Sequence, residues 1–253
     1  MGNPYAQPGF RGRFDWGLVG AANLAPEVAV VAVFDVLSFT TALTVAVDSG
    51  IEVFPFRWRD ERATAFAHER GAVLAVGRSQ AKPGDISLSA LAIRAAKGVE
   101  RLVLPSPNGS TISHDVAELG ATVIGVSLRN VDAAADWTIR RLADRPDASV
   151  AAIAAGERWP DGSLRPAVED LWGAGAYLAA LAERGFGPLS PEARIAAAAY
   201  TSVAGDFAAE LRACVSGQEL ITWNYSADVE VATEVNSTKV VPLLTGESFT
   251  NAG

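Results

Sequence analysis

The chain has 253 residues, of which 49% are hydrophobic and 20% are charged, and its formal net charge is −8 at pH 7. This composition is typical of a folded globular protein and excludes a disordered chain. The negative charge repels phosphate backbones, so we expect no nucleic acid partner. A small anion would meet the same repulsion, and its binding therefore requires a local cation, an arginine cluster or a helix N-terminus.

The sequence contains one cysteine, Cys214, and two histidines, His68 and His114. These numbers exclude an internal disulfide, a thiolate metal cluster and a three-histidine metal centre. A metal bound here would therefore be a hard cation on oxygen ligands. The single cysteine fits a reducing cytoplasm, and no apolar run reaches the roughly 20 residues needed to span a bilayer. We expect a cytoplasmic protein without a membrane partner.

Short β-branched segments alternate with longer Ala- and Leu-rich segments along most of the chain. The expected strands are residues 28–34, 51–56, 73–76, 101–104, 121–126 and 150–154. The expected helices between and after them are residues 40–48, 60–69, 110–118, 131–142 and 166–184. Beyond residue 187 the pattern predicts helices at 191–213, 217–223 and 227–235 and a closing strand at 239–243.

This alternation predicts a layered α/β/α fold with a mostly parallel or mixed sheet. We expect one α/β domain over residues 1–253, with a flexible N-terminal segment at 1–20 and a helical C-terminal region at 188–253 packed on the sheet. In such folds ligands bind beyond the carboxyl ends of the strands. The residues that follow each expected strand are therefore the candidates for a functional site.

The first candidate motif follows the first expected strand. Asp35 stands at the strand end, and Ser38, Thr40 and Thr41 accompany the start of the next helix. A carboxylate there can hold a cation, while hydroxyls and amides at a helix N-terminus can bind an anion. Helix capping alone would also explain the hydroxyls.

Two further strand ends carry groups suited to an anion. Asn108, Gly109 and Ser110 follow one strand and begin a helix, where backbone amides can hold phosphate. Arg129 and Asn130 follow another, and the planar guanidinium of an arginine suits phosphate or carboxylate. A plain capped turn and a solvated surface arginine are the alternatives.

The fourth motif is a dense group of charges after the last expected strand of the series. Glu157 and Arg158 follow that strand, and Arg165, Glu169 and Asp170 surround the start of the long helix. Such a group can hold a cation and an anion side by side, although a surface ion-pair network would look the same. Glu169 and Asp170 are about 100° apart on a helix, so we expect only one of them to face a site.

No single motif is specific, but in this order the set resembles the 2-phosphosulfolactate phosphatase family. The segments that carry the resemblance are residues 35–41, 107–111, 127–130, 156–158 and 169–175, with 240–242 near the C-terminus. The resemblance implies a magnesium-dependent hydrolase that releases phosphate from 2-phosphosulfolactate to give sulfolactate, a step associated with coenzyme M synthesis. It also leaves room for a homodimer.

Roles for individual residues follow from the resemblance and the motifs together. We expect Mg²⁺ on Asp35 and Glu157, with Asp170 or Glu169 as a further ligand or as the base for the attacking water. Arg129 is expected to neutralise charge in the transition state. The residues expected to bind the small phosphorylated substrate are Ser38, Thr40, Thr41, Asn108, Gly109, Ser110, Asn130 and Arg158. Whether Asp35 is a ligand, a base or a nucleophile stays open.

One segment departs from the family pattern. Relatives typically have a Gly-Glu-Arg segment followed by a Gly-Asn-Ser-Pro loop, whereas this chain has Gly77-Arg78-Ser79-Gln80 and then residues 83–89. An acid and an amide are therefore missing. This departure favours one alternative, a phosphatase for another small phosphorylated hydroxy acid. A non-catalytic anion-binding relative is the second alternative.

Overall fold

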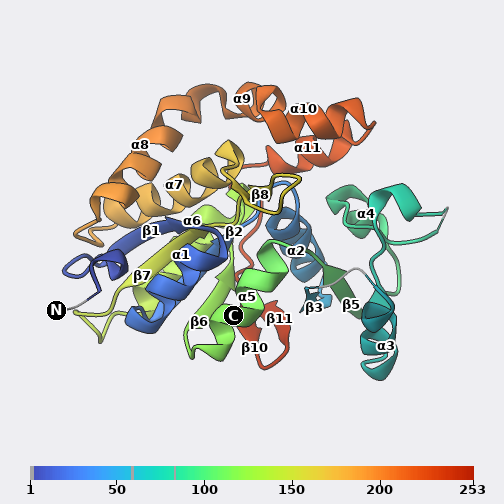
Figure 1. Cartoon of the computed structure of the whole chain (residues 1–253), viewed down its shortest axis with the longest axis horizontal. Coiled ribbons are helices and arrows are strands. Elements are labelled where there is room, and N and C mark those ends of the chain that lie inside the picture. The colour runs from blue at the N-terminus through green and yellow to red at the C-terminus, as the bar shows by residue number, and fades with distance from the viewer. Residues whose placement is uncertain (1–2, 58–59, 83) are drawn as a thin grey trace.

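The computed structural model describes residues 3–57, 60–82 and 84–253. Its centre is a nine-stranded sheet (Figure 1). In spatial order the strands are β1 (Gly12–Trp16), β7 (Val150–Ala154), β2 (Val30–Phe34), β6 (Thr122–Gly125), β10 (Pro242–Thr245), β11 (Ser248–Asn251), β3 (Glu52–Phe56), β5 (Arg101–Pro105) and β4 (Val73–Leu74).

The sheet consists of two parallel sets joined by an antiparallel hairpin. β1, β7, β2 and β6 form one parallel set, and β3, β5 and β4 form the other. The β10–β11 hairpin lies between them, with Leu243 opposite Ile124 of β6 and Phe249 opposite Val53 of β3. The predicted mostly parallel or mixed sheet is confirmed.

Helices cover both faces of this sheet. They are α1 (Gly17–Leu24), α2 (Phe39–Asp48), α3 (Glu61–Glu69), α4 (Ala90–Ala95), α5 (Gly109–Glu118), α6 (Val131–Arg141), α7 (Val168–Glu183), α8 (Pro191–Val203), α9 (Phe207–Ala213), α10 (Val215–Thr222) and α11 (Ser226–Ala232). The side chains of β2 alternate between two cores, as the pleat of a strand requires. Val30, Ala32 and Phe34 pack with α6 and α7, whereas Val31 and Val33 pack with α1, α2 and α5.

The C-terminal helices form a further layer over α7. Figure 1 shows α8 to α11 crossing the molecule above α7, and most of their buried hydrophobic residues belong to the same core as α6 and α7. The predicted helical C-terminal region is thus confirmed. The helix expected at 191–213 is divided into α8 and α9 by a short 3-10 turn at Ala204–Asp206.

The contact between α7 and α8 depends on a glycine. A Cβ atom on Gly175 would lie 2.0 Å from the carbonyl oxygen of Ala196, which is a backbone atom that cannot move aside. We expect Gly175→Ala to lower the free energy of unfolding by about 1–3 kcal/mol, the usual cost of overpacking. Denaturant unfolding measures this change. Gly205→Ala is the matched control, because a Cβ there meets nothing within 4 Å; equal stability of the two variants would contradict the expectation.

The N-terminal segment differs from the expectation of a flexible stretch at 1–20. Residues 12–16 form β1, which pairs with β7 at the edge of the sheet, and α1 follows directly. Phe14 is buried there, and the guanidinium of Arg13 donates to the carbonyl oxygens of Ala6 and Phe10. The local sequence does not indicate this pairing, because each residue of β1 pairs with a residue 138 positions later in the chain. Met1 and Gly2 lie outside the described residues.

The closing strand also differs from its prediction. Of the strand expected at 239–243, only the last two residues belong to β10. β11 follows after a tight turn at Gly246, whose φ of +62° suits glycine.

Within the described residues, no helix combines the length and the apolar character needed to cross a membrane.

Candidate active site

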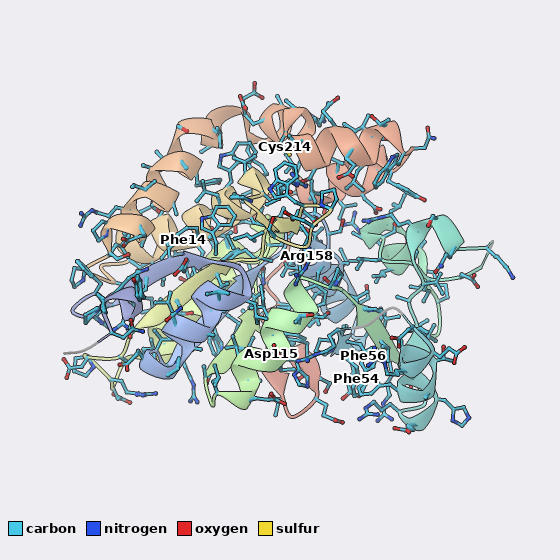
Figure 2. The ribbon with its side chains drawn as sticks, viewed as in Figure 1. Phe14, Phe54, Phe56, Asp115, Arg158 and Cys214 are labelled. Atoms are coloured by element: carbon cyan, nitrogen blue, oxygen red, sulfur yellow. The ribbon has the colours of Figure 1, made fainter. Side chains whose placement is uncertain are left out.

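A cavity of about 780 Å³ lies beyond the ends of β2, β5 and β7. It is bounded by the small β8–β9 sheet (Glu157–Arg158 with Leu164–Arg165) and by α10. Figure 2 shows Arg158 near the middle of the molecule, below Cys214, which lies between α9 and α10. The charged residues that line the cavity are Asp35, Glu157, Glu219, Arg78, Arg158 and Arg165.

Asp35 is fixed between the starts of two helices. Its Oδ1 accepts a hydrogen bond from the amide of Phe39 at 3.1 Å, at the first residue of α2. Its Oδ2 accepts one from the amide of Gly109 at 2.8 Å, at the first residue of α5, and one from Ser106 Oγ at 3.1 Å. Because helix N-termini carry partial positive charge, this position stabilises a carboxylate.

The close approach of α5 to Asp35 requires glycine at position 109. A Cβ atom there would lie 2.8 Å from Asp35 Oδ2 and 2.4 Å from the ring of Phe39. Gly109 therefore acts through its backbone: the amide reaches the carboxylate because no side chain stands between them.

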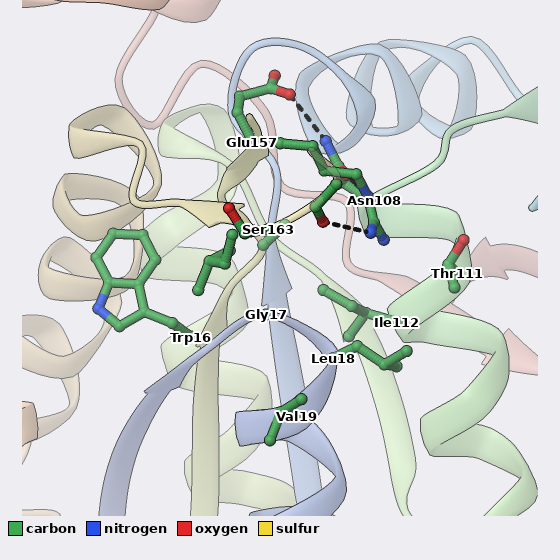
Figure 3. Close-up of a pocket in the computed structure, with 13 residues that line it drawn as sticks. Trp16, Gly17, Leu18, Val19, Asn108, Thr111, Ile112, Glu157 and Ser163 are labelled. Carbon is green, nitrogen blue, oxygen red and sulfur yellow. Dashed lines mark hydrogen bonds between the residues drawn. The ribbon is translucent and has the colours of Figure 1, made fainter. Parts of the chain in front are cut away.

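Glu157 carries a negative charge that its surroundings disfavour. Burial, followed by repulsion from Asp35 and then Glu169, raises the pKa of Glu157 to about 7. Asn108 Nδ2 donates to its Oε2 at 3.0 Å, and Asn108 Oδ1 in turn accepts from Arg158 Nε at 3.3 Å (Figure 3). Asn108 thus orients the Glu157 carboxylate, while the Arg158 guanidinium bonds to Asn108 and not to Glu157 itself.

A smaller cavity of about 340 Å³ adjoins these three side chains. Figure 3 shows that it extends from Glu157 and Asn108 toward Trp16, Leu18 and Val19. Asn108, Glu157 and Arg158 line both cavities. The Glu157–Asn108 hydrogen bond therefore lies where the polar cavity meets the more apolar one.

Asp170 connects the loops that carry Asp35 and Glu157. Its Oδ1 accepts from the amide of Val36 at 2.7 Å and its Oδ2 from the amide of Gly156 at 2.8 Å. These amides neighbour Asp35 and Glu157, so one buried side chain fixes the spacing of the two loops. Burial, with repulsion from Glu169, raises the pKa of Asp170 well above its usual value.

The expected trio of Asp35, Glu157 and Asp170 does not meet at one point. Among the described residues, the one group of three His, Cys, Asp or Glu side chains with ligand atoms within 4.8 Å of one another is His114, Asp115 and Glu118 on α5. Asp170 does not line the cavity that Asp35 and Glu157 line, and its two oxygens accept from the amides of Val36 and Gly156. The structure gives it a positioning contact where the sequence predicted a metal ligand.

The family assignment follows from comparison with known families. The model of the 2-phosphosulpholactate phosphatase family matches residues 20–247. The chain belongs to this family. The resemblance predicted from the motifs is confirmed, and the phosphatase family is one of hydrolases acting on phosphoric monoesters.

Glu169, expected as the alternative to Asp170, does not line the phosphatase cavity either. It hydrogen-bonds to Ser216, and Cys214 Sγ donates to its Oε2 at 3.7 Å. Ser216 does line the cavity, so Glu169 lies behind it. Burial raises the pKa of Glu169. Neither of the two neighbouring acids lines the cavity: Asp170 holds two backbone amides and Glu169 bonds to α10, and the role expected for one of them stays a prediction.

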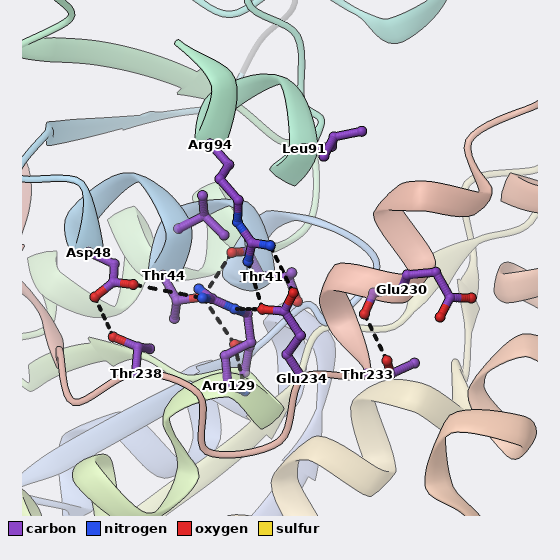
Figure 4. Close-up of polar contacts among 12 residues, drawn as sticks. Thr41, Thr44, Asp48, Leu91, Arg94, Arg129, Glu230, Thr233, Glu234 and Thr238 are labelled. Atoms are coloured by element: carbon purple, nitrogen blue, oxygen red, sulfur yellow. Dashed lines mark hydrogen bonds and ion pairs between the residues drawn. The ribbon is translucent and has the colours of Figure 1, made fainter. Parts of the chain in front are cut away.

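Arg129 lies in a different part of the phosphatase, against the later turns of α2 (Figure 4). Its Nε donates to Glu234 Oε2 at 3.2 Å and its Nη1 to Thr44 Oγ1 at 3.3 Å. It does not line the cavity that contains Asp35. Arg129 follows a strand end but lies away from the cavity, because β6 borders the β10–β11 hairpin and the loop after β6 faces the C-terminal segment. The expected catalytic role of Arg129 is therefore not supported by its position.

Asn130 has a structural role beside Arg129. Its Oδ1 accepts from the amide of Ser127 at 2.9 Å, and its Nδ2 donates to the carbonyl oxygen of Val240 at 3.0 Å. These bonds cap the 3-10 turn at Leu128–Asn130 and attach it to the C-terminal segment. Asn130 does not line the cavity, and its expected role in substrate binding stays a prediction.

The other expected substrate-binding residues fall into two groups. Ser38, Asn108 and Arg158 line the cavity, as predicted for a binding role. Three hydroxyls do not: Thr40 Oγ1 donates to the carbonyl oxygen of Asp35, Ser110 Oγ donates to that of Leu104, and Thr41 is buried. The hydroxyls of Thr40 and Ser110 thus bond to the backbone around the two helix starts, and the expected contact of the three residues with substrate stays a prediction.

The sequence argument missed Arg78 and its partner. Arg78 lines the cavity; its Nη2 donates to Ser38 Oγ at 2.5 Å, and its Nε donates to Asp228 Oδ2 at 3.1 Å. The short strand β4 precedes Arg78, so the strand-end argument could have found it. Nothing local in the sequence links Arg78 to Asp228, which is 150 residues later.

Proposed function

We propose that this chain is a Mg²⁺-dependent phosphatase that hydrolyses 2-phosphosulfolactate to sulfolactate and inorganic phosphate. The observation that carries the proposal is that Asp35 and Glu157 share one cavity with Arg78, Arg158 and Arg165. The substrate carries a phosphate, a carboxylate and a sulfonate. The three arginines supply the local positive charge that an anionic substrate needs, because the chain as a whole is acidic.

The donor set fits a magnesium ion. Mg²⁺ is usually bound by one or two carboxylates, with water and substrate phosphate completing its octahedral shell. Asp35 and Glu157 would hold it, since both line the cavity. The raised pKa of Glu157 supports this assignment because it marks a carboxylate without enough positive charge beside it. When bound, Mg²⁺ would neutralise the charge of the phosphoryl oxygens.

The protein groups in the cavity would position the phosphate and neutralise its charge. Phosphoryl transfer depends mainly on these two effects. Arg158 can bind phosphoryl oxygens and stabilise charge in the transition state, and Ser38 can contribute a hydroxyl. Asn108 keeps the Glu157 carboxylate and the Arg158 guanidinium in fixed relation, because it hydrogen-bonds to both.

Phosphate release is the measurement that tests the proposal. The purified protein is incubated with 2-phosphosulfolactate and with a panel of small phosphorylated hydroxy acids, in Mg²⁺ and in EDTA. We expect release from 2-phosphosulfolactate in Mg²⁺, loss of release in EDTA, and recovery when Mg²⁺ is added in excess. Undiminished release in EDTA would remove the metal from the proposal, and a strong preference for another acid would replace the substrate.

A further inference from the structure

Arg78 stands where two cavities meet. The larger contains Asp35 and Glu157; the second, of about 480 Å³, is lined by Gly77, Arg78, Ser79, Leu88, Trp223 and Tyr225. Arg78, Leu88 and Trp223 line both. A substrate whose phosphate lies near Asp35 would therefore have Arg78 beside its remaining groups.

The guanidinium of Arg78 is held from several directions. Nε donates to Asp228 Oδ2 at 3.1 Å, Nη2 donates to Ser38 Oγ at 2.5 Å, and the guanidinium carbon lies 5.5 Å from the centroid of the Tyr225 ring. Its side chain is 15% exposed. Because long side chains lose much freedom on binding, an arginine that is already oriented binds an anion at lower entropic cost.

One edge of this guanidinium stays available. Nη1 makes no hydrogen bond to any residue that the structure describes, whereas Nε and Nη2 are both used. Asp228 cannot turn to occupy it, because its Oδ1 accepts from Ser89 Oγ at 2.7 Å and from the amide of Leu91 at 3.0 Å. The buried Asp228 thus sets the orientation of Arg78 and leaves its Nη1 available for another partner.

We propose that Arg78 is a specificity-determining residue that binds an acid group of the substrate other than the phosphate, a carboxylate or a sulfonate. The assignment rests on the proposed phosphatase function and names what the cavity selects. Asp228 acts as its positioning residue. Leu88 and Trp223 supply apolar walls beside the acid group, which strengthens the charge interaction by excluding water.

The test compares four phosphate monoesters that differ only in their acid groups. They are 2-phosphosulfolactate with both groups, phospholactate with the carboxylate, phosphoisethionate with the sulfonate, and ethyl phosphate with neither. We expect Arg78→Gln to lower kcat/KM about 10- to 100-fold for the esters that carry the bound group, mainly through KM, as for loss of a charged hydrogen bond. Ethyl phosphate should change less than about threefold, within the range of a small indirect effect. The single-acid ester that loses activity identifies the bound group.

Two variants control for the role of Arg78 in folding. Arg94→Gln removes another arginine that pairs with the C-terminal region, through Glu234, but does not line either cavity; its selectivity should equal that of the wild type. Arg78→Lys keeps the charge and should recover part of the selectivity. If Arg78→Gln is unstable because Asp228 becomes an unpaired buried charge, the double variant R78Q/D228N removes both charges and is used instead.

An equal loss on all four esters would overturn the assignment, because Arg78 would then act on the phosphate or on folding. A binding measurement separates this outcome from failure of the proposed activity. Sulfolactate and inorganic phosphate are titrated calorimetrically into the wild type and Arg78→Gln, which requires no turnover. We expect sulfolactate binding to weaken at least about 10-fold with phosphate binding unchanged. Unchanged sulfolactate binding, or none to the wild type, would overturn it.

Discussion

Glu157→Gln is expected to abolish phosphate release and, in the absence of metal, to stabilise the fold above neutral pH. The activity falls because the variant lacks one of the two carboxylates that would hold Mg²⁺, Asp35 and Glu157. The stability rises because glutamine keeps a carbonyl oxygen for Asn108 Nδ2 but carries no charge. It thereby also relieves the repulsion from Asp35 and Glu169.

The sign of the pH effect follows from the raised pKa of Glu157, about 7 against a usual value of 4.5. Between these values the folded protein binds more protons at this site than the unfolded chain, so stability falls as pH rises from about 4.5 to 7. The penalty is fully present above about pH 7 and amounts to at most about 3 kcal/mol.

Denaturant unfolding in EDTA at pH 5 and pH 8 measures this effect. The stability advantage of Glu157→Gln over the wild type should be larger at pH 8 than at pH 5. Glu61→Gln, at an exposed position on α3, is the control and should show no such pH-dependent advantage. A Glu157→Gln protein that is less stable than the wild type at pH 8 would show that the carboxylate is compensated in the fold.

Asp35→Asn is expected to remove activity as well, but with the opposite effect on stability. Loss of a preorganised group that stabilises charge costs activity by about 100- to 1,000-fold. The asparagine turns an NH₂ group toward donors that now lack an acceptor: either the amide of Phe39, or the amide of Gly109 together with Ser106 Oγ. A buried unsatisfied donor costs about 1–3 kcal/mol of stability.

Phosphate release and thermal unfolding of Asp35→Asn test both parts. Asp161→Asn is a matched control, because Asp161 is exposed between β8 and β9 and its Oδ1 accepts from Ser163 in a way that asparagine can reproduce. It should keep wild-type activity and stability. Near-normal phosphate release by Asp35→Asn would remove Asp35 from the catalytic centre.

The sequence predicted the fold class because its buried strands are continuous apolar runs. Val30–Phe34 and Val150–Ala154 are wholly buried, and alternate with helices as parallel strands require. The β10–β11 hairpin between two parallel sets could not be predicted, since it depends on single pairings of Leu243 with Ile124 and Phe249 with Val53. Local patterns do not encode such distant contacts.

The candidate site was predictable to the extent that strand ends mark it. Asp35, Asn108 and Glu157 were found in this way, and all three line one cavity. Arg129 also follows a strand but faces the C-terminal segment, and Asp170 holds two loop amides behind the cavity and does not line it. The sequence identifies which residues are charged and where strands end, whereas three-dimensional contacts decide which charges face the substrate.

The most direct test is the initial rate of phosphate release from 2-phosphosulfolactate, measured side by side for the wild type, Asp35→Asn and Glu157→Gln in Mg²⁺. We expect a rate for the wild type that EDTA removes, and about a 100- to 1,000-fold lower rate for each variant. A wild type that releases no phosphate, or variants that match it, would contradict a phosphatase centre built on these two carboxylates.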